Sequence, residues 1–140
     1  SLILGGVTIP YDRGLDGHSD ADVLTHAVMD ALLSAAGLPD IGHLFPDSDP
    51  DYKGCSSMLM LEHVVRLLDE RRMEISYVSA VIMAERPKLA RFIPLIRESL
   101  ARAMRTGAGA VNVTATTTEG MGVIGEGKAI AASAFVLIGT

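Results

Sequence analysis

The chain has 140 residues with a formal net charge of −5, and 49% of its residues are hydrophobic although only 4% are aromatic. This length suits one domain, residues 1–140, whose core is built mainly from small and aliphatic side chains. The acidic balance argues against nucleic acid as a partner, because its groove needs a basic stripe, and no apolar run is long enough for a membrane span.

The predicted elements alternate between strands and helices and end with two strands. In chain order they are a hairpin (residues 2–10), a helix (19–36), a long loop (38–54), a second helix (56–72), a strand (75–84), a third helix (87–105) and two final strands (111–117 and 130–138). Pro94 lies inside the third helix and predicts a break in its first turns. The order is typical of an α/β fold, an α+β sandwich with a small mixed sheet and helices on one side.

The start of the first helix carries two histidines and two carboxylates within nine residues. Ser19 or Asp20 suits the N-cap, and Asp22 and His26 then share one face of the helix. His18 lies just before the cap, where ligand phosphates can also meet the free N–H groups of the first turn. His26 suits zinc, although a histidine among alanines and leucines can equally be a core residue with a satisfied ring.

The loop over residues 38–54 is long for a compact domain, and loops of this length are more often functional than idle. Asp47, Asp49 and Asp51 alternate like the start of a calcium loop, but Tyr52 stands where that loop needs glycine. An EF-hand is therefore rejected, and a solvated loop and a ligand-binding loop stay as the alternatives.

Two strand ends carry residues suited to phosphates. Glu85–Leu89 follows a buried strand and opens a helix, so Lys88 could meet a phosphate, or it could be an ordinary surface lysine. Thr114–Glu119 ends another strand. Its threonines are ordinary strand residues, yet hydroxyls followed by a carboxylate can also contact phosphate oxygens and hold a divalent cation.

Hydropathy and cysteine content add two expectations. The mean hydropathy of +0.33 is high for a small monomer, which favours burial of apolar surface between subunits. Cys55 is the single cysteine, so an internal disulfide is impossible and a reducing compartment fits.

Four segments together resemble the 2-C-methyl-D-erythritol 2,4-cyclodiphosphate synthase family of the non-mevalonate isoprenoid pathway. They are LILGGVTIPYDRGLDGHSDADVLTHAVMDALL, DIGHLFPDSDPDYKG, ERPKL and NVTATTTEGMG. Their order and spacing are highly specific, and the resemblance covers essentially the whole chain. An acidic chain that binds a polyphosphate needs backbone N–H groups, local cations and metals to neutralise the anion, and these segments carry such groups.

The resemblance implies a lyase that cyclises 4-diphosphocytidyl-2-C-methyl-D-erythritol 2-phosphate to 2-C-methyl-D-erythritol 2,4-cyclodiphosphate and releases CMP. It implies Zn²⁺ or a similar divalent transition metal, and Mg²⁺ or Mn²⁺, as cofactors. It also implies a homotrimer of chorismate-mutase-like architecture, with sheets around the threefold axis and active sites between subunits. The expected location is the bacterial cytoplasm or, in a eukaryote, the plastid stroma.

The resemblance also assigns residues. His26 matches a zinc ligand and Glu119 the magnesium ligand, and His18 and Thr117 are candidates for stabilising the transition state. The remaining positions that match substrate-binding residues are Ser19, Asp40, Ile41, Gly42, Phe45, Pro46, Asp47, Ser48, Asp49, Ala84, Pro87, Lys88, Leu89, Ala90, Ala115, Thr116 and Thr118.

Two departures from the family pattern matter. The Asp-x-His segment that supplies two further zinc ligands would precede residue 1, so the chain as written is expected to bind zinc weakly and to be poorly active. Near the C-terminus Val123 replaces an aromatic residue and Glu126 an arginine, so anion or prenyl-diphosphate binding in the trimer's central cavity is not carried over. Lys128 partly restores the charge at a different position.

Two rival hypotheses remain. The first is a non-catalytic trimeric nucleotide-binding module that has lost its zinc site. The weaker one is a trimeric enzyme of chorismate-mutase-like architecture, whose chemistry needs no metal ligands.

Overall fold

The structure is a computed structural model that describes residues 2–11, 22–45 and 56–140. Its strands are β1 (Leu2–Leu4), β2 (Val7–Ile9), β3 (Glu74–Met83), β4 (Val111–Thr116) and β5 (Ala131–Gly139). Its helices are α1 (Val23–Ala35), α2 (Ile41–Leu44), α3 (Ser57–Glu70), α4 (Ile93–Met104) and α5 (Gly122–Gly125), with short 3-10 turns at Ala90–Phe92 and Ala108–Ala110.

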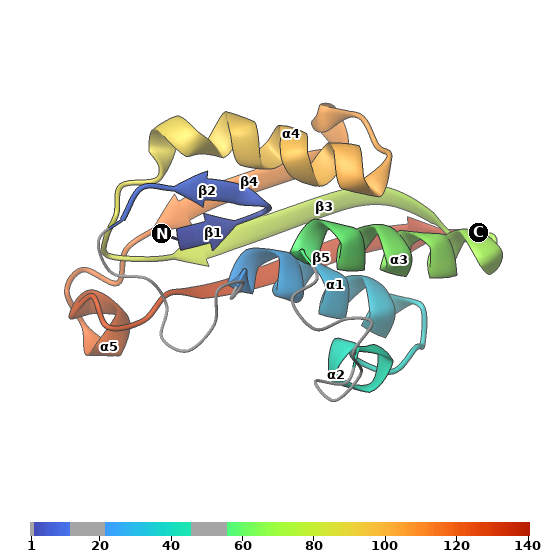
Figure 1. The fold of residues 1–140 in the computed structure, drawn as a ribbon, viewed down its shortest axis with the longest axis horizontal. Coiled ribbons are helices and arrows are strands. Elements are labelled where there is room, and N and C mark those ends of the chain that lie inside the picture. The colour runs from blue at the N-terminus through green and yellow to red at the C-terminus, as the bar shows by residue number, and fades with distance from the viewer. Residues whose placement is uncertain (1, 12–21, 46–55) are drawn as a thin grey trace.

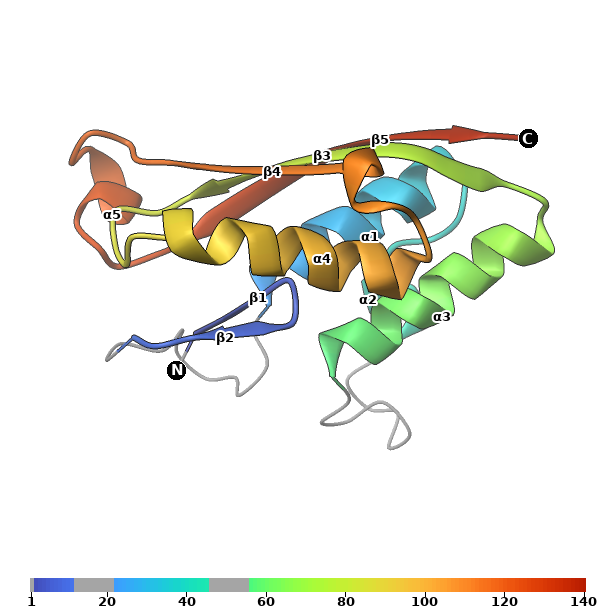
Figure 2. The same cartoon turned by 90° about the horizontal axis from the view of Figure 1, so that it is seen from above.

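The main sheet has three strands in the order β4-β3-β5, with β3 parallel to β4 and antiparallel to β5. The predicted small mixed sheet is therefore confirmed. Figure 2 shows α1, α3 and α4 together on one side of this sheet, as predicted, with the β1–β2 hairpin beyond them. None of the described helices is both long enough and apolar enough to cross a bilayer.

The core lies between the sheet and the helices. Val78, Ala80 and Ile82 alternate along β3 and are buried, because α1 packs against β5 and α4 against β4 on that face. Alternate residues on the other face of the sheet stay partly or largely exposed, and Phe135 on β5 is 80% exposed. In a single chain the helices therefore cover only one face of the sheet.

Several element boundaries differ from those expected. The long loop contains α2, and α5 was not predicted. The third helix begins at Ile93 rather than at residue 87, because Pro94 occupies the first turn, where its missing N–H costs nothing. Asp22 caps α1, so the first helix starts at Val23 and not at residue 19.

The buried carboxylate of Asp22 joins three elements. It accepts hydrogen bonds from the backbone N–H groups of Gly5 (2.9 Å) and Gly6 (2.8 Å) in the β1–β2 turn. It also accepts from the N–H (3.0 Å) and hydroxyl (2.8 Å) of Thr25 in α1, and from the hydroxyl of Ser57 at the start of α3 (2.7 Å). Five donors compensate for burying one charge, so Asp22 fixes the hairpin and α3 against the first turn of α1, where His26 lies.

Candidate functional site

The described candidate residues fall into two groups. The first lies on α1 and α2 and consists of His26, Asp40, Ile41, Gly42 and Phe45. The second lies where β3 and β4 end and consists of Ala84, Pro87, Lys88, Leu89, Ala90 and Ala115–Glu119. His18, Ser19, Pro46, Asp47, Ser48 and Asp49 lie outside the described residues, and so does Cys55.

His26 lies in the first turn of α1 and is half-buried, so it is not sealed in the core. Its backbone N–H donates to the carbonyl of Asp22 at 3.1 Å, which ties it to the buried cap. Its side chain remains partly accessible, as a ligand to a metal must be.

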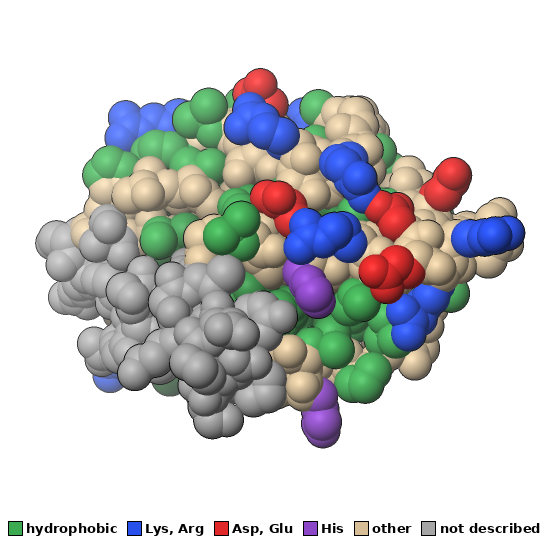
Figure 3. Space-filling view, turned by 45° about the vertical axis from the view of Figure 1, so that its right-hand side comes forward, with side chains coloured by type: hydrophobic (Ala, Val, Ile, Leu, Met, Phe, Trp, Pro, Cys, Tyr) green, Lys and Arg blue, Asp and Glu red, His purple; other side chains and the backbone are tan. Residues whose placement is uncertain are grey.

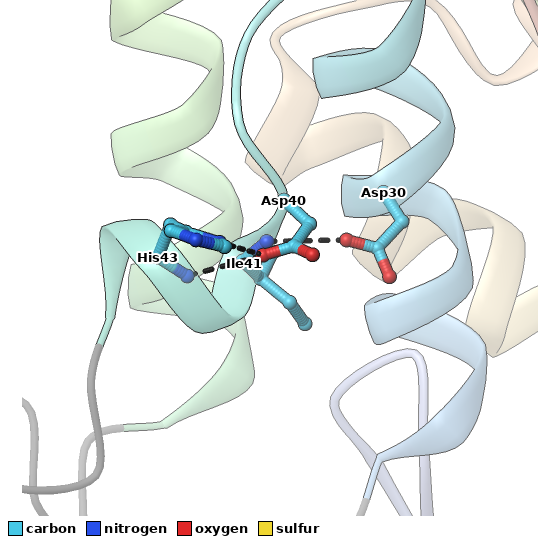
Figure 4. Close-up of polar contacts among 4 residues, drawn as sticks. All are labelled: Asp30, Asp40, Ile41 and His43. Carbon is cyan, nitrogen blue, oxygen red and sulfur yellow. Dashed lines mark hydrogen bonds and ion pairs between the residues drawn. The ribbon is translucent and has the colours of Figure 1, made fainter.

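Asp40 is the N-cap of α2, and one of its carboxylate oxygens serves two donors of His43. Oδ1 accepts from the backbone N–H of His43 at 3.1 Å and lies 2.9 Å from its ring Nδ1 (Figure 4). The His43 imidazole, and then the His43 backbone N–H, hold the pKa of the Asp40 carboxyl below its ordinary value. Asp40 is therefore an exposed carboxylate that stays ionised near neutral pH.

Asp30 holds the next residue of this segment from the side of α1. Its Oδ1 accepts from the backbone N–H of Ile41 at 3.2 Å (Figure 4). Asp30 is one helical turn after His26, so the two share a face of α1. Phe45, at the other end of α2, is 6% exposed and packs edge-on against the His63 ring with centroids 5.5 Å apart. The α1 and α2 candidates therefore form one neighbourhood.

The second group is brought together by the parallel pairing of β3 and β4, because the carboxyl ends of parallel strands lie at the same edge. The register runs to Met83 opposite Thr116, and the backbone N–H of Ala84 donates to the carbonyl of Thr116 at 3.0 Å. Lys88 is exposed beyond the end of β3, whereas Leu89 is buried against the core. The predicted cytidine-binding and threonine segments are thus neighbours.

The threonines end in a tight turn that presents Glu119. The backbone N–H of Glu119 donates to the hydroxyl of Thr117 at 3.2 Å, and the hydroxyl of Thr118 donates to the carbonyl of Met121 at 2.7 Å. Glu119 has φ +55° and Gly120 φ +79°, so the chain reverses there and leaves the Glu119 carboxylate exposed.

The two implied metals fit the described residues differently. Mg²⁺ is held by one or two carboxylates together with water and substrate phosphates, and an exposed Glu119 beside threonine hydroxyls suits that role. A catalytic Zn²⁺ needs three protein ligands. Within residues 2–11, 22–45 and 56–140, no group of three histidine, cysteine, aspartate or glutamate side chains stands close enough to hold a metal, so His26 alone does not make a zinc centre.

The two groups are separate within one chain. In the described part of the molecule, no hydrogen bond joins His26 or Asp40–Gly42 to Ala84–Ala90 or Thr116–Glu119. A hollow of about 500 Å³ lies elsewhere, between the C-terminal ends of α3 and α4 and the start of β3, and no predicted site residue lines it. The two groups, here called half-sites, are therefore not joined to each other by hydrogen bonds within the described residues of one chain.

Asp22, Asp30 and His43 are the polar residues that sequence reasoning missed as contributors to these half-sites. Asp22 was singled out from the sequence only for its spacing from His26, although aspartate is itself one of the preferred N-cap residues. Lys128 forms an exposed ion pair with Glu126 at 3.0 Å, so its positive charge lies beside the glutamate that replaces the family's arginine.

Comparison with known proteins places the chain in a family. Residues 1–139 match the YgbB family. The 2-C-methyl-D-erythritol 2,4-cyclodiphosphate synthase of Geotalea daltonii is 56% identical over 137 residues, which cover 98% of this chain and 80% of that protein. The bifunctional enzyme IspD/IspF of Desulforudis audaxviator is 59% identical over 133 residues, but the chain spans only 34% of its length.

A solved structure of 2C-methyl-D-erythritol-2,4-cyclodiphosphate synthase in its CDP-bound form superposes with a TM-score of 0.91 at 39% identity. The match covers 99% of this chain and 89% of that one. Family match, sequence identity and fold agree over nearly the whole chain. The chain therefore belongs to the YgbB family.

Proposed function

We propose that the chain is a cyclase that converts 4-diphosphocytidyl-2-C-methyl-D-erythritol 2-phosphate to 2-C-methyl-D-erythritol 2,4-cyclodiphosphate and CMP. The observation that carries the proposal is the pairing at the ends of β3 and β4, where the N–H of Ala84, four residues before Lys88, donates to the carbonyl of Thr116, three residues before Glu119. The synthase names of the relatives at 53–56% identity and the CDP-bound solved structure support it.

The reaction is an intramolecular phosphoryl transfer. An oxygen of the 2-phosphate attacks the β-phosphorus, and the bond from that phosphorus to the oxygen bridging the two phosphates breaks, so CMP leaves with the bridging oxygen. The attacking phosphate is already an anion, so no general base is strictly required. Catalysis is therefore positioning and charge neutralisation.

Each group of residues has a part in this scheme. Lys88 and the hydroxyls of Thr116 and Thr117 bind the diphosphate, and the segment from Ala84 to Ala90 holds the cytidine. Mg²⁺ bound at Glu119 would draw negative charge from the phosphate oxygens. Thr117 and His18 stabilise the charge that develops on the transferring phosphoryl group. Asp40–Gly42 contact the methylerythritol.

We further propose that the active protein is a homotrimer in which half-sites of neighbouring subunits meet. The open face of the sheet supports this arrangement, since Phe135 and Leu137 of β5 are 80% and 65% exposed and pair with Ser79 and Tyr77 of β3. Replacing Phe135 with Ser should lower the mass seen in sedimentation analysis, whereas Leu59→Ser, an exposed change on α3, should not. A Phe135→Ser protein that keeps the full mass at low concentration would contradict this interface.

The test of the reaction is product formation from the authentic substrate with Zn²⁺ and Mg²⁺, followed as CMP by chromatography and as cyclic diphosphate by phosphorus NMR. Lys88→Gln should raise KM at least tenfold, because a hydrogen-bonded charge on phosphate is lost. Arg91→Gln is the matched control, because Arg91 lies in the same segment but stacks on Phe92. CDP binding with no CMP release would instead indicate a non-catalytic nucleotide-binding module.

A further inference from the structure

The substrate segment Asp40–Gly42 is held from two sides by side chains that have no part in the scheme above. On one side, Oδ1 of Asp30 accepts the backbone N–H of Ile41 at 3.2 Å. On the other, ring Nδ1 of His43 lies 2.9 Å from Oδ1 of Asp40. Figure 4 shows Asp30 reaching this segment from α1, and the His43 ring folding back onto Asp40 within α2.

The two contacts fix different features of the segment. The His43 ring and backbone N–H both occupy Oδ1 of Asp40, so the rotation of the carboxylate is set while Oδ2 keeps its capacity to accept from a ligand. The Asp30 contact ties the backbone of Ile41 to the helix face that also carries His26. α2 is one turn of helix and is too short to be stable by itself, so its position depends on this contact together with the packing of Ile41, Leu44 and Phe45 against the core.

We propose that Asp30 and His43 are positioning residues that preorganise Asp40–Gly42 for the methylerythritol end of the substrate. This inference rests on the proposed function, which places that end of the substrate on Asp40. Neither side chain needs to touch the substrate. Each contact restricts the conformations of the segment before the substrate binds. The substrate then binds more tightly, because less conformational entropy is lost on binding.

The half-site arrangement makes the inference specific. On the proposed function, CDP would contact the residues at the ends of β3 and β4 but not Asp40–Gly42, which only the full substrate would reach. Loss of either positioning contact should therefore weaken binding of the substrate and leave binding of CDP unchanged. A general loss of stability would lower both affinities together.

The test compares dissociation constants for the substrate and for CDP by titration calorimetry. Asp30→Ala and His43→Leu should each weaken substrate binding about fivefold, the equivalent of one solvent-exposed hydrogen bond, with CDP binding unchanged. Asp30→Asn keeps an acceptor oxygen and His43→Asn keeps a donor near the place of Nδ1, so both should restore most of the affinity. Ser34→Ala, exposed one turn further along α1, is the matched control and should change neither constant.

Three results would overturn the inference. They are an unchanged substrate affinity in Asp30→Ala and His43→Leu, an equal loss for CDP, and an unaltered protein that binds substrate no more tightly than CDP. A selective loss of substrate affinity in a protein that releases no CMP would retain the positioning role and refute the proposed cyclase function.

Discussion

The hydrogen bond from Ser57 to the buried Asp22 carboxylate gives the sharpest stability prediction. Asp22 is fully buried and Ser57 is 2% exposed, and the hydroxyl lies 2.7 Å from the carboxylate. A hydrogen bond to a charged group contributes about 1.5–3 kcal/mol. Ser57→Ala leaves four of the five donors in place, so the expected loss is that of one hydrogen bond to the carboxylate, about 2 kcal/mol. For a domain of this size, that loss lowers Tm by roughly 8 °C.

The assay is urea unfolding at one fixed protein concentration, because assembly would make the apparent stability concentration-dependent. Ser56→Ala is the matched control. Ser56 is the exposed N-cap of α3, its hydroxyl accepts from Leu59 at 3.3 Å, and its loss should cost about 1 kcal/mol. In an Asp22→Asn background, Ser57→Ala should cost less than it does alone, because the charge is gone. Equal costs for Ser57→Ala and Ser56→Ala would refute the reasoning that Asp22 anchors three elements.

Two further predictions concern the hairpin turn and the Asp40 carboxyl. Gly5→Ala should destabilise by about 2–4 kcal/mol in the same assay, because φ is +59° and a Cβ would lie 2.8 Å from the buried Ile96 side chain. Gly37 also has a positive φ (+71°) but has open space around it, so Gly37→Ala should cost only the backbone strain. If Gly37→Ala and Gly5→Ala lower the stability equally, the packing argument is contradicted. The lowered pKa of Asp40 means that its contact with His43 stabilises the fold above the ordinary aspartate pKa and is lost as pH falls through the depressed value. His43→Leu should raise that pKa in a carbon-detected NMR titration, and an unchanged midpoint would show that the imidazole does not contact the carboxylate.

Most of the fold could be predicted from local patterns. The hairpin at Gly5–Gly6, the buried stripe of α3 and strands β3, β4 and β5 follow from periodicity and turn residues, and the structure confirms them within a few positions. The sequence predicts a start of α1 that is too early, because Ser19 and Asp20 are N-cap residues as favourable as Asp22 when only neighbouring residues are considered. The choice of Asp22 depends on donors from Gly5, Gly6 and Ser57, which are distant in sequence and invisible to local propensity.

The candidate site was predictable only in part, for a similar reason. The contact between Ala84 and Thr116 can be predicted if β3 and β4 are assumed to be parallel neighbours that end at the same edge of the sheet. The contacts of Asp30 with Ile41 and of His43 with Asp40 depend on where α2 lies against α1, and α2 has no periodicity to reveal it. Residue types and motif order indicated the chemistry, whereas the supporting contacts needed the fold.

The central claim is that one active site is completed by residues of two neighbouring subunits. The direct measurement mixes Asp40→Ala protein with Glu119→Gln protein under conditions that exchange subunits, and follows CMP release. If the two half-sites come from different subunits, about a quarter of the sites in the random mixture combine an intact Asp40 with an intact Glu119, so CMP release rises above that of either variant alone. A mixture that exchanges subunits but stays as inactive as its parents would contradict the claim.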